Sequence, residues 1–217
     1  MIEAVAFDLD GTLIESERVW EAARREVTES GGGRWRADAQ PSMMGLSTPE
    51  WIAYMQRELG VKLDAGEIRS RVIEQVGARY REKPPLIDGA DGAARRLADR
   101  WPLALASSSP RELIELVVEL IGLADAFEVV VSAEEGARGK PAPDVYLRAC
   151  ELLSTPPPRT VAIEDSGAGV GSAAAAGMPL VLIPGSEFPP DPEVLDSADL
   201  VLESIAELDA EAVARLG

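Results

Sequence analysis

Short apolar segments alternate with helical segments through the second part of this 217-residue chain. From Asp88 onward, each apolar run of strand length is followed by a stretch with helical periodicity. This alternation is typical of a parallel sheet whose connections are helices. We therefore predict an α/β fold, with a Rossmann-like parallel sheet flanked by helices. The predicted strands are 4–7, 103–106, 127–131, 160–163, 180–183 and 200–202, and the predicted helices of this part are 92–100, 110–120, 144–153, 170–176 and one at the C-terminus.

The segment between the first strand and this alternating part contains no convincing strand. Apolar residues at helical spacing predict helices over 16–30, 47–59 and 64–82. Ser16 is available to cap the first helix, and Ser47-Thr48-Pro49-Glu50 has the composition of a helix cap with proline in the first turn. We predict a discontinuous core, residues 1–14 plus 85–217, and an all-helical subdomain at 15–84 inserted after the first strand.

Two carboxylates follow the first predicted strand, where Ala4–Phe7 leads into Asp8-Leu9-Asp10-Gly11-Thr12. Asp8 and Asp10 point the same way if the chain is extended, so they can serve one site. Asp and Gly are also common in ordinary turns. In an open α/β sheet, however, ligands bind beyond the carboxyl ends of the strands. The position after a buried strand therefore favours a functional site.

Further polar residues occupy the corresponding position at later strands. Ser107 follows the strand at 103–106, Lys140 lies in a later loop, and Glu164 and Asp165 follow the strand at 160–163. Taken singly, Ser107 can cap the next helix, Lys140 can be a solvated charge, and the acidic pair can belong to a turn. Because all of them lie at or just beyond the carboxyl ends of parallel strands, we interpret them as one ligand site.

The chain contains no histidine and one cysteine, Cys150. These counts exclude a Ser-His-Asp triad, a Cys-His pair, a histidine-ligated zinc site and an internal disulfide. If the chain is an enzyme, carboxylates or lysine must transfer its protons, and a metal must bind to oxygen ligands. Oxygen ligands favour Mg²⁺.

The 21 basic and 38 acidic residues give a formal net charge of −17. Nucleic acids and anionic membrane surfaces require positive patches, so we expect neither as a partner. A small phosphorylated substrate is compatible with this charge if the site has local positive charge of its own. The absence of a long apolar run, of a basic leader and of paired cysteines favours a cytoplasmic protein, which we expect to be monomeric.

Four motifs in order resemble those of the haloacid dehalogenase superfamily, specifically its small phosphatases and β-phosphoglucomutase-like enzymes. Asp8–Thr12 resembles the first motif, Leu105–Ser109 the second, Gly139–Asp144 around Lys140 the third, and Ile163–Gly169 the fourth. The resemblance covers essentially the whole chain. It implies a phosphoric monoester hydrolase, and the helical insert takes the position of the family's helical cap.

The resemblance implies that Asp8 is the nucleophile and forms an aspartyl phosphate. Asp10 would act as general acid toward the leaving oxygen and then as general base toward water. Lys140 would neutralise charge on the phosphate and hold Asp8 in place. Ser107, Ser108 and nearby backbone N–H groups would donate hydrogen bonds to the phosphoryl oxygens.

The same resemblance implies Mg²⁺ as the cofactor. Its ligands would be the Asp8 side chain, the main-chain carbonyl of Asp10, and Asp165. Glu164 would bind the ion either directly or through water. The ion would bridge the nucleophile and the phosphate.

Substrate choice in this family depends on the cap. The residues that we expect to include substrate contacts are Glu15, Ser16, Trp20, Gly45, Leu46 and Thr48. β-Phosphoglucomutases carry a histidine on the first cap helix, where this chain has tryptophan near that position, and an arginine in a cap loop, where this chain reads Gly45-Leu46-Ser47-Thr48. Both differences favour hydrolysis, and a sugar phosphomutase is the alternative.

Two other activities fit less well. The 2-haloacid dehalogenases lack an acid at the position of Asp10. Receiver-type phospho-acceptor domains also combine acids, Mg²⁺ and lysine on a parallel sheet, but their acceptor follows a later strand and no helical insert follows the first. We therefore predict a Mg²⁺-dependent phosphatase for a small phosphorylated metabolite, such as a sugar phosphate.

Overall fold

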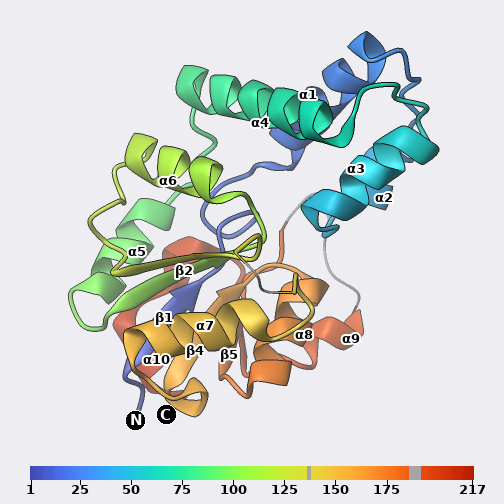
Figure 1. Cartoon of the computed structure of the whole chain (residues 1–217). Helices are drawn as coiled ribbons and strands as arrows, with labels where there is room; N and C mark the ends of the chain where they lie inside the picture. The colour runs from blue at the N-terminus through green and yellow to red at the C-terminus, as the bar shows by residue number, and fades with distance from the viewer. Residues whose placement is uncertain (136–137, 186–191) are drawn as a thin grey trace. The chain divides into compact units, whose positions relative to one another are not determined.

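The computed structural model describes residues 1–135, 138–185 and 192–217. They form two compact units, which we call the core unit (Met1–Glu15 with Pro85–Gly217) and the helical unit (Ser16–Pro84). The sheet lies in the core unit, and the helical unit, described throughout, contains helices and no strand (Figure 1). Among the described residues, no helix is long and apolar enough to cross a membrane.

The described residues of the core unit form a six-stranded sheet in which every pair of neighbouring strands is parallel. Its strands are β1 (Ala4–Phe7), β2 (Leu103–Ser107), β3 (Val129–Ser132), β4 (Thr160–Glu164), β5 (Leu180–Leu182) and β6 (Leu200–Val201). They lie in the order β3-β2-β1-β4-β5-β6. This arrangement confirms the predicted α/β class, and it is the order of the Rossmann fold.

The strand order reverses between β1 and β4. From β1 the chain builds the sheet outward through β2 and β3, and it then returns to place β4 on the other side of β1. At such a reversal, the helices that follow the two strands lie on opposite faces and leave a crevice beyond the strand ends. Asp8 and Asp10 follow β1, and Glu164 and Asp165 lie at the end of β4, so the acidic residues meet at this crevice.

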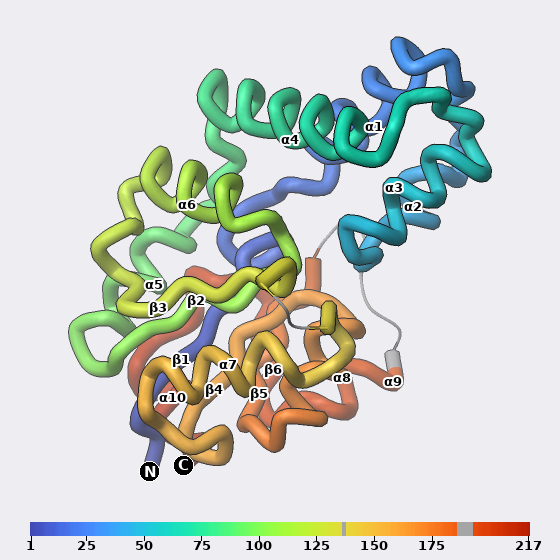
Figure 2. The backbone as a smooth tube through the Cα atoms, in the orientation of Figure 1, coloured from blue at the N-terminus to red at the C-terminus, as the bar shows by residue number. Residues whose placement is uncertain are grey.

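Helices cover the sheet on both sides. They are α5 (Ala90–Ala98), α6 (Arg111–Leu120), α7 (Asp144–Leu153), α8 (Gly167–Ala176), α9 (Pro192–Leu195) and α10 (Ala210–Ala214). Figure 1 shows α7 and α8 on one side of the sheet and α5 and α6 on the other. The chain returns to its starting point, because Gly217 lies beside Ile2 (Figure 2).

The two faces of the sheet differ in side-chain size. Alternate residues of a strand point to opposite faces, and on the face toward α7 and α8 the three central strands present alanine. These alanines, at positions 6, 104, 106 and 162, are buried in one cluster with residues of α7 and α8. The opposite face of the same strands carries larger apolar residues, among them Phe7, Leu105 and Ile163. The small side chains let α7 lie close to the strands.

The helical unit consists of α1 (Glu17–Ser30), α2 (Ala39–Met43), α3 (Thr48–Arg57) and α4 (Ala65–Glu82). Helices α1 and α3 both pack against α4. The predicted cap of α3 is confirmed, because the Glu50 carboxylate accepts the backbone N–H of Ser47 at 2.9 Å. Ser16 immediately precedes α1, but its side chain makes no capping hydrogen bond to that helix.

Several element boundaries differ from the sequence prediction. Strand β3 begins at Val129 instead of Phe127, whose ring packs edge-on against Phe7 with centroids 5.9 Å apart. Helix α8 begins at Gly167 instead of Val170, because the Ser166 side chain accepts the Gly169 N–H and starts the helix early. The short helices α2 and α9 were not predicted.

The start of α8 depends on a close approach between Gly169 and Glu164. A Cβ at position 169 would lie 1.9 Å from the carboxyl group of Glu164, which is fully buried. We expect Gly169→Ala to destabilise the protein by about 2 kcal/mol in urea unfolding, because the carboxylate must shift in a packed core. Gly167→Ala is the matched control, since its Cβ would make an ordinary 3.4 Å contact. Equal stability of the two variants would contradict this account.

Candidate active site

Asp8 is placed by the sheet itself. Its N–H donates to the Ile163 carbonyl at 2.9 Å, so the hydrogen bonding of β1 to β4 continues one residue past β1. The Asp8 residue is 6% exposed. Gly11 then turns the chain with φ +89°, and a Cβ there would lie 2.0 Å from Asp165 Oδ2. Glycine is required at position 11 both for the turn and for the approach of Asp165.

Lys140 connects the ends of β1 and β4. Its ammonium lies 2.5 Å from Asp8 Oδ1 and 2.6 Å from Glu164 Oε1. All three side chains are at most 8% exposed. This burial excludes the alternative that Lys140 is a solvated surface charge. A buried ammonium needs such partners, because an unpaired buried charge costs several kcal/mol.

Tyr146 of α7 belongs to the same cluster, although it was not predicted from the sequence. Its fully buried hydroxyl donates to Glu164 Oε1 at 2.6 Å, and its ring lies 4.8 Å from the Lys140 ammonium. Glu164 Oε1 thus accepts from both neighbours. In the sequence, Tyr146 is one of several apolar positions on the core-facing side of a helix, and nothing distinguishes it from an ordinary core aromatic residue.

Burial is the main influence on the pKa values of Asp8 and Asp165. It raises the pKa of Asp8 from 3.8 to about 8, and the negative charges of Glu164 and Asp10 add to this effect, whereas Lys140 opposes it. Burial also raises the pKa of Asp165 well above its ordinary value, with Asp8 and Glu164 contributing. For Lys140 the two acids outweigh the cost of burial and raise the pKa of its ammonium, which therefore stays charged.

The carboxylates outnumber the cation beside them. Oxygens of Asp8, Glu164 and Asp165 all lie within 4.8 Å of one another, and Lys140 is the ammonium paired with two of them. Oxygen donors crowded at this spacing fit a hard divalent cation such as Mg²⁺. Asp10 is not part of this group of carboxylates, so only its main-chain carbonyl is left to fill the predicted metal role.

The Asp10 carboxylate lies against the end of β2 instead. Its Oδ2 accepts the hydroxyl of Ser109 at 2.7 Å and that of Ser107 at 3.2 Å. Ser108, between these two serines, is half-buried at the same strand end. The structure therefore brings Ser107 to Asp10, and it adds Ser109, which was not predicted from the sequence. A phosphate contact by Ser107 and Ser108 stays a prediction.

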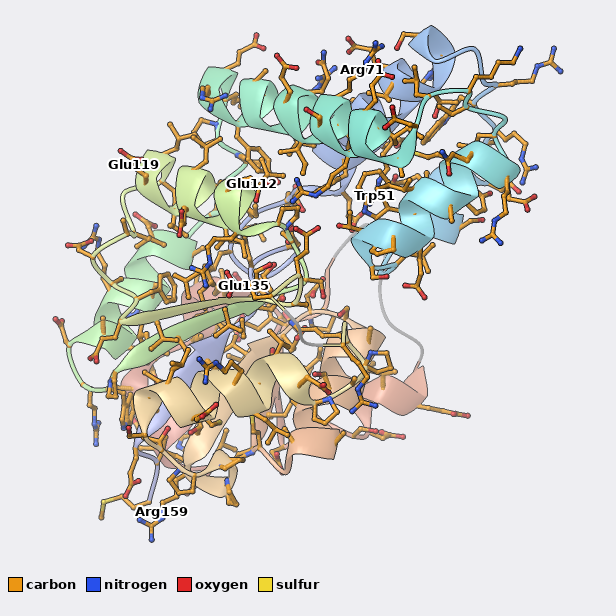
Figure 3. All side chains as sticks on the ribbon, viewed as in Figure 1. Trp51, Arg71, Glu112, Glu119, Glu135 and Arg159 are labelled. Atoms are coloured by element: carbon orange, nitrogen blue, oxygen red, sulfur yellow. The ribbon has the colours of Figure 1, made fainter. Side chains whose placement is uncertain are left out.

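The substrate residues expected from the cap are spread over two units. Glu15 is exposed and belongs to the core unit, whereas the helical unit holds Ser16, Trp20, Gly45, Leu46 and Thr48. Trp20 is 6% exposed and packs against Trp51 of α3 with ring centroids 6.3 Å apart. Figure 3 labels Trp51 in the helical unit. The Arg24 guanidinium lies 4.9 Å and 5.3 Å from these two rings. Trp20 thus packs between helices, and substrate contact by these residues stays a prediction.

We expect Lys140→Met to lower the free energy of unfolding by about 3 kcal/mol at a pH above about 8, where Asp8 is ionised, because it leaves two buried carboxylates without their cation. Guanidinium unfolding of the two proteins measures the difference. Lys62→Met is the matched control, since Lys62 is an exposed lysine of the helical unit. A loss no larger than that of the control would show that the cluster does not need its ammonium.

The raised pKa values predict the pH dependence of the metal-free protein. Between 3.8 and about 8 the folded state holds the Asp8 proton, whereas the unfolded state releases it. Stability should therefore fall as pH rises through this window, by up to about 1.4 kcal/mol per pH unit. Thermal unfolding in chelator across the window measures the slope, which Asp8→Asn should reduce. Added Mg²⁺ should stabilise the wild type more at high pH, since it displaces protons from the carboxyl groups. If the stability of the metal-free protein rises with pH in this window, the account of Asp8 is contradicted.

Comparison with known proteins agrees with this geometry. A family model described as haloacid dehalogenase-like hydrolase matches residues 2–177. The chain is 34% identical over 212 residues to hexitol phosphatase B of Escherichia coli K12, covering 96% of this chain and 95% of that protein. It is 34% identical over 182 residues to a phosphorylated carbohydrates phosphatase of Thermotoga maritima, covering 82% of each.

Solved structures show the same fold. CbbY from Rhodobacter sphaeroides, in complex with phosphate, superposes with a TM-score of 0.88 at 29% identity and covers 99% of this chain and 100% of its own. β-Phosphoglucomutase from Clostridium difficile gives a TM-score of 0.84 at 22% identity, covering 100% and 97% of the two chains. The chain therefore belongs to the haloacid dehalogenase-like hydrolases, and the family assigned to it from its four motifs is confirmed.

Proposed function

We propose that this protein is a Mg²⁺-dependent phosphatase that hydrolyses a small phosphorylated metabolite, a sugar phosphate or a similar compound, through an aspartyl phosphate on Asp8. The observation that carries the proposal is the arrangement at the strand ends, where Lys140 binds the Asp8 carboxylate at 2.5 Å and Asp10 lies two residues further on. Relatives named for hexitol phosphate and phosphorylated carbohydrates support this class of substrate.

Asp8 would attack phosphorus while Asp10 protonates the departing ester oxygen. A carboxylate nucleophile splits the displacement into two steps, formation and hydrolysis of an acyl phosphate. In the second step Asp10 takes a proton from the attacking water. One group can fill both roles because the proton that it gives in the first step leaves it ready to act as a base in the second.

Charge is the main obstacle to this chemistry, since an anion must attack an anion. Lys140 is held between Asp8 and Glu164, where its ammonium would also face a phosphoryl oxygen bound to Asp8. The hydroxyls of Ser107 and Ser108 and the backbone N–H groups beyond β2 would donate hydrogen bonds to the remaining oxygens. Such fixed donors act most strongly in a buried site, where water does not screen them.

Asp8, Asp165 and Glu164, with the main-chain carbonyl of Asp10, would hold Mg²⁺. Glu164, whose Oε1 already accepts from Lys140 and Tyr146, would bind the ion either directly or through water. The ion would supply neutralisation of the nucleophile and of the phosphoryl group. Its binding would also keep Asp8 ionised near neutral pH, despite the burial that raises the pKa of this group to about 8.

We propose that the helical unit acts as the cap that selects the substrate. A sugar phosphomutase is the alternative function, since that activity uses the same core chemistry. The alternative is disfavoured because a mutase must keep water from its acyl phosphate, and the cap of this chain lacks the histidine and the arginine of the mutases. Glucose 1-phosphate isomerisation, measured beside phosphate release, distinguishes the two activities.

We expect Asp8→Asn to abolish phosphate release from p-nitrophenyl phosphate in Mg²⁺ buffer, because an amide oxygen is too weak a nucleophile to form the acyl phosphate. Mass spectrometry after an acid quench should find a phosphoryl group on the Asp8 peptide of the wild type. Asp125→Asn is the matched control, since Asp125 is an exposed partner of Arg95. Comparable turnover in Asp8→Asn and the control would refute the assignment.

A further inference from the structure

The hydrogen bonds around Asp10 separate the roles of two neighbouring serines. Asp10 Oδ2 accepts from Ser109 at 2.7 Å and from Ser107 at 3.2 Å, so Ser109 provides the shorter bond. The Ser107 hydroxyl also accepts the backbone N–H of Ser109 at 3.0 Å. A serine hydroxyl has only one proton to donate. If Ser107 donates that proton to the phosphoryl group, it can no longer hold Asp10, and Ser109 must do so.

Ser109 is itself held by the neighbouring strand. Its carbonyl accepts the hydroxyl of Ser132 at 2.7 Å, and Ser132 pairs with Ser107 in the register of β2 and β3. The Ser132 hydroxyl in turn accepts the backbone N–H of Glu134 at 3.2 Å. Ser107 and Ser132 are fully buried and Ser109 is 8% exposed. The Ser109 hydroxyl is therefore presented to Asp10 from a position that the sheet fixes.

We propose that Ser109 is a positioning residue for Asp10, an inference that rests on the proposed function. Because Ser107 and Ser109 both donate to Oδ2, this oxygen acts as the hydrogen-bond acceptor of the carboxyl group. The proton that Asp10 gives to the leaving oxygen is then carried by Oδ1. Ser109 thereby turns Oδ1 toward the leaving group in the first step and toward water in the second, and it does so without touching the substrate.

The test uses leaving groups that differ in their need for a proton. Nitrophenolate leaves without one, whereas the alkoxide of an alkyl phosphate such as glycerol 1-phosphate does not. We expect Ser109→Ala to lower kcat on the alkyl phosphate by about tenfold or more, as part of the loss of general acid catalysis, and to change kcat on p-nitrophenyl phosphate much less. KM should change little for either substrate.

Three further variants complete the design. Ser109→Thr keeps the hydroxyl and should retain activity on the alkyl phosphate. Ser109→Cys keeps the shape with a weak donor, so it should behave like Ser109→Ala and replaces it if the alanine variant does not fold. Ser197→Ala removes an exposed serine hydroxyl that donates to the Glu193 carbonyl, and it should leave both activities unchanged.

Asp10→Asn separates failure of this inference from failure of the proposed function. Suppose first that Asp10→Asn loses more activity on the alkyl phosphate than on p-nitrophenyl phosphate. If the Ser109→Ala and Ser109→Cys variants then lose both activities equally, or lose neither, Ser109 does not position the acid and the inference is overturned. If Asp10→Asn itself shows no discrimination, Asp10 is not the acid, and the proposed mechanism falls together with the inference. Selective loss in both Asp10→Asn and Ser109→Ala supports the two together.

Discussion

The ion pairs of Lys140 with Asp8 and Glu164 are the interaction on which the core unit depends. They join residues from the ends of β1 and β4 and from the loop before α7. Charged groups buried in this way are tolerated only while they remain paired. Three features of the fold keep these groups paired. They are the order of the strands, the close packing of α7 on the sheet and the glycine near the start of α8. The electrostatics of the site therefore constrain the fold as much as the fold constrains the site.

The same cluster explains how an acidic protein can bind a phosphate ester. The net charge of −17 is a property of the whole surface, whereas binding and chemistry depend on the groups within a few ångströms of the phosphorus atom. There the ammonium of Lys140, a divalent cation held by three carboxylates and the donors beyond β2 would outweigh the charge of the nucleophile. Burial, which opposes ionisation of Asp8, also strengthens each of these interactions.

The sequence was sufficient to predict the fold class and the convergence of Asp8, Lys140 and Glu164, because parallel strands place residues after their carboxyl ends at one edge. It was not sufficient for Tyr146 and Ser109. The first resembles any core-facing aromatic residue of a helix, and the second acquires its role only from the register of β2 with β3. Helix α2, which contains Pro41, is too short to show a period. Helix α8 starts early because the Ser166 side chain accepts the Gly169 N–H, whereas the close approach of Gly169 to Glu164 is a tertiary contact that no local pattern encodes.

The alanines beneath α7 and α8 limit which amino-acid substitutions this enzyme can accept during evolution. A larger side chain at position 6, 104 or 106 would lift α7 away from the sheet. Tyr146 would move with the helix and lose its reach to Glu164. Inactivating substitutions should therefore occur in the interior of the sheet, at residues that touch neither substrate nor cofactor. Evolution of this protein is therefore constrained at buried residues of the sheet as well as at the residues of the active site.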